Sequence, residues 1–302
     1  MTSRLPASAR TLLATAIDYA GLFPPAVLRM PDAVAEYLRH RAEPDRWALG
    51  RFVVPAARLE EFVAAAREAG LLPAPADDPV MLAVLATGDL PAGLEAVGRL
   101  QATAQELGVV VAAIETRAAQ PAEARAAARL IPREYEGWVE IPLGTPAGPM
   151  IEAVLGGGGR PKIRTGGVSP ELFPTADHIL EFLAEAVRRD TAFKATAGLH
   201  HPLRGVYPYT YQPGSATGPM YGYLNLLVAT ALLMEEQPVD EARRALLDED
   251  REAFEFGEPG LTWRGRRFDL ATLARVRQSG LRSIGSCSFG DPMRELQPLL
   301  PT

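Results

Sequence analysis

Short apolar or β-branched runs alternate with amphipathic, alanine-rich stretches along almost the whole chain. The apolar runs predict eight strands, at residues 14–19, 51–55, 80–86, 109–116, 137–142, 161–165, 192–197 and 282–288. The amphipathic stretches predict helices at 32–40, 59–69, 91–107, 121–130 and 175–189. Strands that alternate with helices run parallel, and eight of them favour a (β/α)8 TIM barrel over an open sheet. We therefore expect one α/β barrel domain over residues 1–302.

The connection between the seventh and eighth predicted strands is longer than the others, and we treat residues 205–268 as an insertion. Its first part holds five of the eight tyrosines, Tyr207, Tyr209, Tyr211, Tyr221 and Tyr223. Long loops at the catalytic end of a barrel often act as lids. The rings therefore either close over a substrate, with Tyr209 as a binding residue, or pack the insertion onto the barrel. Helices are expected at 221–234 and 239–254.

Polar side chains gather at the C-terminal ends of the predicted strands, where TIM barrels carry their chemistry. They are Asp18, Glu115 with Thr116, Glu140, Lys162 with Arg164, Lys194 with Thr196, His200 with His201, and segment 285–288 with Ser286 and Ser288. Such a dense polar set, at positions that could have been apolar, favours catalysis over simple binding.

Two of these strands each carry a lysine followed two residues later by another polar residue. Because successive side chains of a strand point to opposite faces, Lys162 shares a face with Arg164, and Lys194 shares one with Thr196. Crowded cations and partial burial would lower the pKa of Lys162, with Lys194 and Arg164 as the cause. The alternative is that each lysine simply pairs with a nearby carboxylate.

A neutral lysine amine can form a Schiff base with a carbonyl substrate, and the iminium then accepts electrons when a carbon–carbon bond is made or broken. Glu115, Glu140 or Asp18 could move the protons. This chemistry calls for no cofactor and no metal.

Further residues of this end are candidates for substrate contacts. Gly166 and Gly167 follow the Lys162 strand, where bare backbone can approach a ligand. Arg204 could hold a carboxylate or phosphate. The glycine run 156–159 precedes that strand, at the other end of the barrel, and is expected to be only a turn.

Five short motifs follow one another along the chain: LLATAIDYAGLFPP near the start, AAIET at 112–116, KIRTGG, FKATAGL about thirty residues later, and RSIGSCSF near the end. In sequence and order they resemble motifs of the deoxyribose-phosphate aldolases, which are class I aldolases with a (β/α)8 barrel. The resemblance implies that Lys162 is the Schiff-base lysine, that Lys194 perturbs it and relays protons, and that segment 285–288 belongs to a phosphate-binding end.

The chain also departs from the pattern of that family. The run VMLAVLA has no acid where the family carries a proton-transferring aspartate, Arg164 stands where the family has a small hydroxyl residue, and AGLHHP replaces a phosphate-binding glycine pair. These departures point away from a phosphosugar and towards another aldehyde, ketone or keto acid.

Two other classes of function remain open at the level of sequence. His200 and His201 could bind a divalent metal with Glu115 or Glu140, as in a hydrolase, an isomerase or a class II aldolase. Cys287, ahead of a helix start, could be a nucleophile or a small core residue. A barrel that binds a small molecule without turnover is the third option.

Composition narrows the partners. The net charge of −6, without a basic cluster, argues against nucleic-acid and membrane partners. The single cysteine excludes an internal disulfide and suits a reducing compartment, and the N-terminal apolar stretch is too short for a signal peptide. We expect a cytoplasmic enzyme with a small-molecule substrate, and a homo-oligomer is left open.

Overall fold

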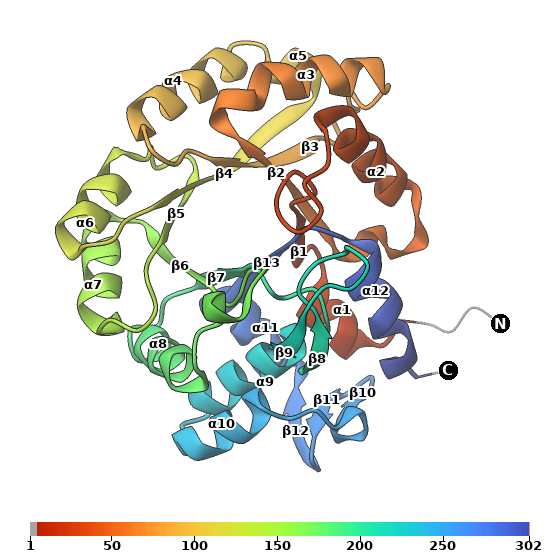
Figure 1. Cartoon of the computed structure of the whole chain (residues 1–302), viewed down its shortest axis with the longest axis vertical. Coiled ribbons are helices and arrows are strands. Elements are labelled where there is room, and N and C mark those ends of the chain that lie inside the picture. Colours follow the sequence, from red (N-terminus) through yellow and green to blue (C-terminus); the bar gives the residue numbers. More distant parts are fainter. Residues whose placement is uncertain (1–4, 302) are drawn as a thin grey trace.

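Eight parallel strands close into a barrel surrounded by helices in the computed structural model, which describes residues 5–301 (Figure 1). The strand order around the barrel is β1-β13-β7-β6-β5-β4-β3-β2. The strands are β1 (Ile17–Tyr19), β2 (Leu49–Pro55), β3 (Val80–Leu85), β4 (Val109–Arg117), β5 (Glu136–Glu140), β6 (Arg160–Arg164), β7 (Phe193–Thr196) and β13 (Leu281–Ser286). The predicted (β/α)8 barrel and its eight strands are confirmed.

The helices lie outside the barrel, as Figure 1 shows. Those that match predictions are α2 (Met30–Ala42), α3 (Leu59–Glu68), α4 (Leu90–Gln101) with α5 (Ala104–Leu107), α6 (Pro121–Leu130) and α8 (Ala176–Arg188). Three more were not predicted, namely α1 (Ala7–Leu13), α7 (Ala147–Gly157) and α11 (Leu270–Ser279), whereas α12 (Gly290–Leu296) is the helix expected to start after Cys287. Helix α7 was not predicted because it is apolar on nearly every side, so its sequence shows no alternation of apolar and polar positions with helical spacing. Its last residue and the left-handed Gly158 form the predicted turn before β6.

The insertion contains more β-structure than expected. It comprises the antiparallel hairpin of β8 (Gly205–Pro208) and β9 (Thr217–Met220), the helices α9 (Tyr223–Met234) and α10 (Val239–Leu246), and an antiparallel sheet of β10 (Phe254–Phe256), β11 (Gly260–Trp263) and β12 (Arg266–Asp269). The predicted helix 239–254 is therefore wrong beyond Leu246. Asp248 accepts hydrogen bonds from Trp263 Nε1, at 2.8 Å, and from Arg264, so the chain after α10 is tied to the sheet.

The five tyrosines of the insertion attach it to the barrel and its loops. The hydroxyls of four donate hydrogen bonds, Tyr207 to Leu203 O at 3.1 Å, Tyr211 to Asp291 Oδ2 at 2.8 Å, Tyr221 to Pro174 O at 2.9 Å and Tyr223 to Pro292 O at 3.2 Å. The fifth ring, Tyr209, packs 5.3 Å from the ring of Phe173. The packing alternative, rather than the lid, describes these rings.

Inward and outward positions alternate along the barrel strands and separate two apolar clusters. The outward set belongs to the large cluster between strands and helices, for example Ile114, Val139, Ile163 and Ala195. A small apolar cluster of Ala20, Val53, Ala83, Ala113 and Trp138 lies on the inward side. Several other inward positions hold polar residues, among them Glu115, Lys162 and Lys194. Within residues 5–301, no helix is long and apolar enough to cross a membrane.

Candidate active site

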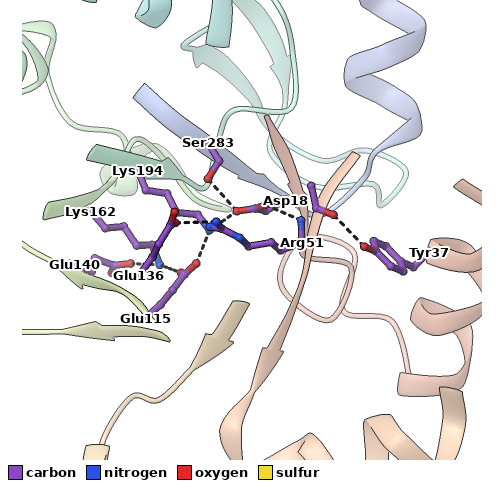
Figure 2. Close-up of polar contacts among 10 residues, drawn as sticks. Asp18, Tyr37, Arg51, Glu115, Glu136, Glu140, Lys162, Lys194 and Ser283 are labelled. Atoms are coloured by element: carbon purple, nitrogen blue, oxygen red, sulfur yellow. Dashed lines mark hydrogen bonds and ion pairs between the residues drawn. The ribbon is translucent and has the colours of Figure 1, made fainter. Parts of the chain in front are cut away.

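Five ionisable side chains from five strands meet inside the barrel (Figure 2). Asp18 comes from β1, Glu115 from β4, Glu140 from β5, Lys162 from β6 and Lys194 from β7. Cross-strand register places Glu140 beside Lys162 and Lys162 beside Lys194. Sequence reasoning predicted all five as catalytic candidates, and the fold brings them together.

Glu115 bridges the two lysines. Its Oε2 lies 2.8 Å from Lys162 Nζ, while its Oε1 accepts a hydrogen bond from Lys194 Nζ. The two amines are therefore close enough to share a single carboxylate, as the adjacent lysine strands predicted. They do not face each other directly, however, because the carboxylate lies between them.

Lys194 is the more enclosed of the two lysines. Its Nζ donates a hydrogen bond to Asp18 Oδ2 at 2.5 Å, and both residues are only 1% exposed. Asp18 also accepts hydrogen bonds from Ser283 Oγ, at 2.9 Å, and from the backbone N–H of Arg51, at 2.8 Å. These bonds fix the orientation of Asp18 and hold Lys194 at the back of the site.

Lys162 lies where the cluster opens. Its Nζ is 3.0 Å from Glu140 Oε2, and the Glu140 side chain is 17% exposed whereas that of Glu115 is 2% exposed. Glu140 is thus the carboxylate of the cluster with the best access to solvent and to an incoming ligand.

The charges correct the prediction for Lys162. Burial lowers its pKa, but Glu115 and Glu140 raise it by more, so the pKa of the Lys162 amine lies above its ordinary value. For Glu115, burial alone would raise the pKa of the carboxyl group. The positive charges of Lys162 and Lys194 outweigh burial and lower that pKa to about 2. The expectation that Lys194 and Arg164 depress the pKa of Lys162 is wrong because carboxylates separate the cations. The alternative, in which each lysine pairs with carboxylates, describes this geometry.

A cavity of about 190 Å³ lies over the cluster at the C-terminal end of the barrel. Lys162, Lys194, Glu115 and Glu140 line its polar part, together with Thr196 and His200. Phe23, Val53 and Leu85 line an apolar part, and the arginines Arg117 and Arg164 contribute to the same lining. Burial lowers the pKa of His200 to about 4, which keeps this imidazole neutral at pH 7.

His201 does not join this cavity. Its Nδ1 pairs with Glu295 Oε2 at 2.8 Å, and its ring stacks on Tyr207 at a centroid distance of 3.4 Å. His200 instead faces Ser286 Oγ, 3.2 Å from its Nδ1. Residues 5–301 contain no group of three or more His, Cys, Asp or Glu side chains that could hold a metal ion. The predicted histidine-based metal site therefore has no ligand set in this part of the chain.

Four other predicted substrate contacts have structural partners instead. Arg204 pairs with Glu249 at 3.2 Å, and its guanidinium lies 5.3 Å from the centre of the Tyr221 ring. A Cβ on Gly166 would meet the Phe173 ring at 2.4 Å, and one on Gly167 would meet Leu172 at 2.4 Å. These glycines allow a loop to pack closely, and neither they nor Tyr209 line the cavity.

The segment after β13 bonds to itself. Ser286 Oγ donates to Ser288 O at 2.6 Å, and Ser288 Oγ accepts from the backbone N–H of Asp291 at 3.2 Å. Cys287 lines the cavity, but burial raises the pKa of its thiol to about 11. Of the two alternatives for Cys287, the nucleophile activated by a helix start is not supported because burial dominates, and the buried thiol matches the small core residue.

Sequence reasoning missed Arg117 and Ser283. Arg117 lies two residues after Glu115 on the same strand, and that spacing places both on the inward face. Ser283 precedes segment 285–288 by two residues, and its hydroxyl donates a hydrogen bond to Asp18. Thr116, which was paired with Glu115 in the prediction, is buried but lies between these two inward positions and therefore faces outward.

Neither family models, curated proteins nor solved structures match this chain, so its own geometry is the basis for assigning a function to the site.

Proposed function

We propose that the protein is a class I aldolase-like lyase that binds a small carbonyl substrate to Lys162 as an iminium. The observation that carries the proposal is the buried pair Lys162 and Lys194, bridged by Glu115 beneath a small cavity. A purely structural ion pair would need no such cavity, and buried charges are costly unless they are paired or used.

Lys162 is the nucleophile and Lys194 the supporting lysine in this proposal. Lys162 lies beside the partly exposed Glu140, whereas Lys194 is enclosed by Asp18 and Glu115. Lys194 keeps Glu115 ionised and fixed in place, and Glu115 then orients the Lys162 amine.

Because the pKa of Lys162 is raised, the amine must lose a proton as the substrate arrives. Glu140 accepts that proton across 3.0 Å. The neutral nitrogen then attacks the carbonyl carbon, and a proton moves from nitrogen to the former carbonyl oxygen to give a carbinolamine. Glu140 returns its proton to the leaving hydroxyl, so one water departs and a protonated iminium remains.

The iminium then serves as the electron sink. When the neighbouring carbon–carbon bond breaks, its electron pair forms an enamine, and the other fragment leaves as an aldehyde after its hydroxyl gives a proton to a carboxylate. The enamine takes a proton on carbon, and water hydrolyses the iminium to release the second product and restore Lys162. We expect this reaction, which needs no disulfide, to take place in the cytoplasm.

Borohydride trapping tests the proposal directly. Wild-type protein is incubated with short aldehydes, ketones and keto acids plus borohydride, and intact and peptide masses are recorded. We expect a reduced adduct on Lys162 and none in Lys162→Met, with circular dichroism confirming that the variant folds. The absence of an adduct from every carbonyl with the wild-type protein, or an equal adduct in Lys162→Met, would refute iminium chemistry at this residue.

A further inference from the structure

Two arginines stand at the rim of the cavity over Lys162. Arg117 is the last residue of β4, two positions after Glu115, and Arg164 is the last residue of β6, two positions after Lys162. Both therefore lie on the inward face, on the two strands that flank β5. The register places Arg117 beside Glu140 and Glu140 beside Lys162.

Neither arginine has an ionic partner in residues 5–301. The nearby carboxylates form ion pairs with lysines instead. Glu115 pairs with both Lys162 and Lys194, and Glu140 pairs with Lys162. No hydrogen bond or ion pair involves the side chains of Arg117 and Arg164 in this part of the chain. Other arginines near the strand ends are paired, such as Arg204 with Glu249. Two free guanidinium groups on one small cavity are an arrangement that an anionic ligand would complement.

The position of the arginines relative to Lys162 limits where the anionic group can be. Arg117 lies one inward position beyond Glu115 and Arg164 one inward position beyond Lys162, and both line the small cavity that Lys162 also lines. A ligand whose carbonyl carbon is at Lys162 Nζ therefore has its anionic group close to that carbon. A carboxylate directly attached to the carbonyl, as in a 2-oxo acid, meets this requirement, and guanidinium groups bind carboxylates through two parallel hydrogen bonds.

The cavity size limits the ligand further. Its volume is about 190 Å³. That space suits a 2-oxo acid of three or four carbons, with its alkyl end against Phe23, Val53 and Leu85.

We infer that the carbonyl substrate of this site is a short-chain 2-oxo acid whose carboxylate is bound by Arg117 and Arg164; this inference rests on the proposed function. A larger adjoining cleft of about 830 Å³ shares Arg117, Glu140 and Arg164 and is also lined by Phe173 and His178. The aldehyde that reacts with the enamine, or is released when the enamine forms, can occupy this cleft next to the 2-oxo acid.

The test compares an anionic and a neutral carbonyl of similar size. Pyruvate and butanone are trapped with borohydride over a concentration series in wild type, Arg117→Gln, Arg164→Gln and the double variant. We expect half-maximal labelling by pyruvate to need at least tenfold higher concentration in each single variant, while labelling by butanone changes less than twofold. Arg164→Lys should restore part of the loss, and Arg129→Gln, on the exposed side of α6, should behave as wild type.

A second measurement separates this inference from the proposed function. Lactate carries the same carboxylate as pyruvate but has no carbonyl to react, so its binding is followed by the shift in melting temperature. We expect lactate to stabilise wild type and not the double arginine variant. If lactate binds through the arginines while no carbonyl labels Lys162, the anion site stands and the aldolase proposal fails.

Other outcomes overturn the inference. Equal labelling by pyruvate and butanone, insensitive to the arginines, would leave the lysine chemistry standing and remove the carboxylate site. No labelling together with no effect of lactate would remove both. Tighter, arginine-dependent binding of inorganic phosphate or deoxyribose 5-phosphate than of lactate or pyruvate would show that the site is built for phosphate.

Discussion

The inward and outward faces of the barrel strands differ in polarity. Outward strand positions such as Ile163 and Ala195 join one large apolar cluster with the helices, whereas the inward positions beside them hold Lys162 and Lys194. Within residues 5–301, five buried residues at or next to inward positions form a small apolar cluster of their own. The helices and the outward faces therefore supply most of the hydrophobic stabilisation, and the interior is free to hold charges.

This contrast explains how so many ionisable groups are tolerated at the centre. Three carboxyl groups face two amines, and each amine has two carboxylate partners. Pairing with opposite charges offsets part of the cost of removing these groups from water. The hydrophobic stabilisation of the outer layer allows the fold to sustain the remainder. The two regions should thus respond differently to mutation. Substitutions in the outer apolar layer should lower the free energy of unfolding, and substitutions in the charged interior should lower the reactivity of Lys162.

The largest loss of stability is expected from Phe182→Ala in α8. This ring is fully buried and packs edge-on against Phe193, at 5.3 Å, on the outward face of β7. Removing it should lower the free energy of unfolding by about 3–5 kcal/mol, whereas Phe182→Leu should cost about 1 kcal/mol. Urea unfolding measures both. Labelling of Lys162 should be unchanged in the fraction that remains folded, and its loss there would contradict the division between the two regions.

Glu115→Gln should cost less stability and yet remove the chemistry. The folded-state pKa of Glu115, about 2, lies below its ordinary value of 4.5, so its ionised form stabilises the fold above pH 4.5. That contribution, roughly 3 kcal/mol, is lost as the pH falls towards 2. Wild type and variant should therefore differ at pH 7 and converge near pH 2 in urea unfolding. Glu61→Gln, on the surface beside Arg58, should leave stability unchanged at both pH values.

A constant difference between Glu115→Gln and wild type across this pH range would show that the carboxylate acts through packing rather than charge. Labelling of Lys162 at wild-type rates in this variant would remove Glu115 from the proposed reaction.

The same contrast shows what the sequence could reveal. A polar residue at the C-terminal end of a predicted barrel strand is conspicuous, so Lys162, Lys194 and Glu140 could be found from local pattern alone. The direction of the pKa shift at Lys162 could not be found in this way. It depends on Glu115, which is 79 residues away from Lys194 in the sequence and which the closed barrel places between the two amines.

Residues outside the barrel strands were harder to place. His201 and Arg204 follow β7 closely in the sequence, but the insertion turns them away to Glu295 and Glu249. The glycines after β6 looked like ligand contacts, and only the position of Phe173 shows that packing requires one of them. Local spacing places a side chain on a face of a strand, whereas a loop residue is placed by whatever packs over it.

The smallest of these effects is expected from Glu140→Gln, at the border between the charged interior and solvent. Glu140 helps raise the pKa of Lys162, so its neutral replacement should lower that pKa while Glu115 still holds the amine in place. The ascending limb of labelling rate against pH should then move towards acid. The plateau should fall by about tenfold or more, because the proton acceptor is gone. Glu152→Gln, exposed on α7, should show neither change. A limb that stays in place or moves towards alkali would mean that the charge of Glu140 does not act on Lys162, and the open side of the cluster would then be no different from its closed side.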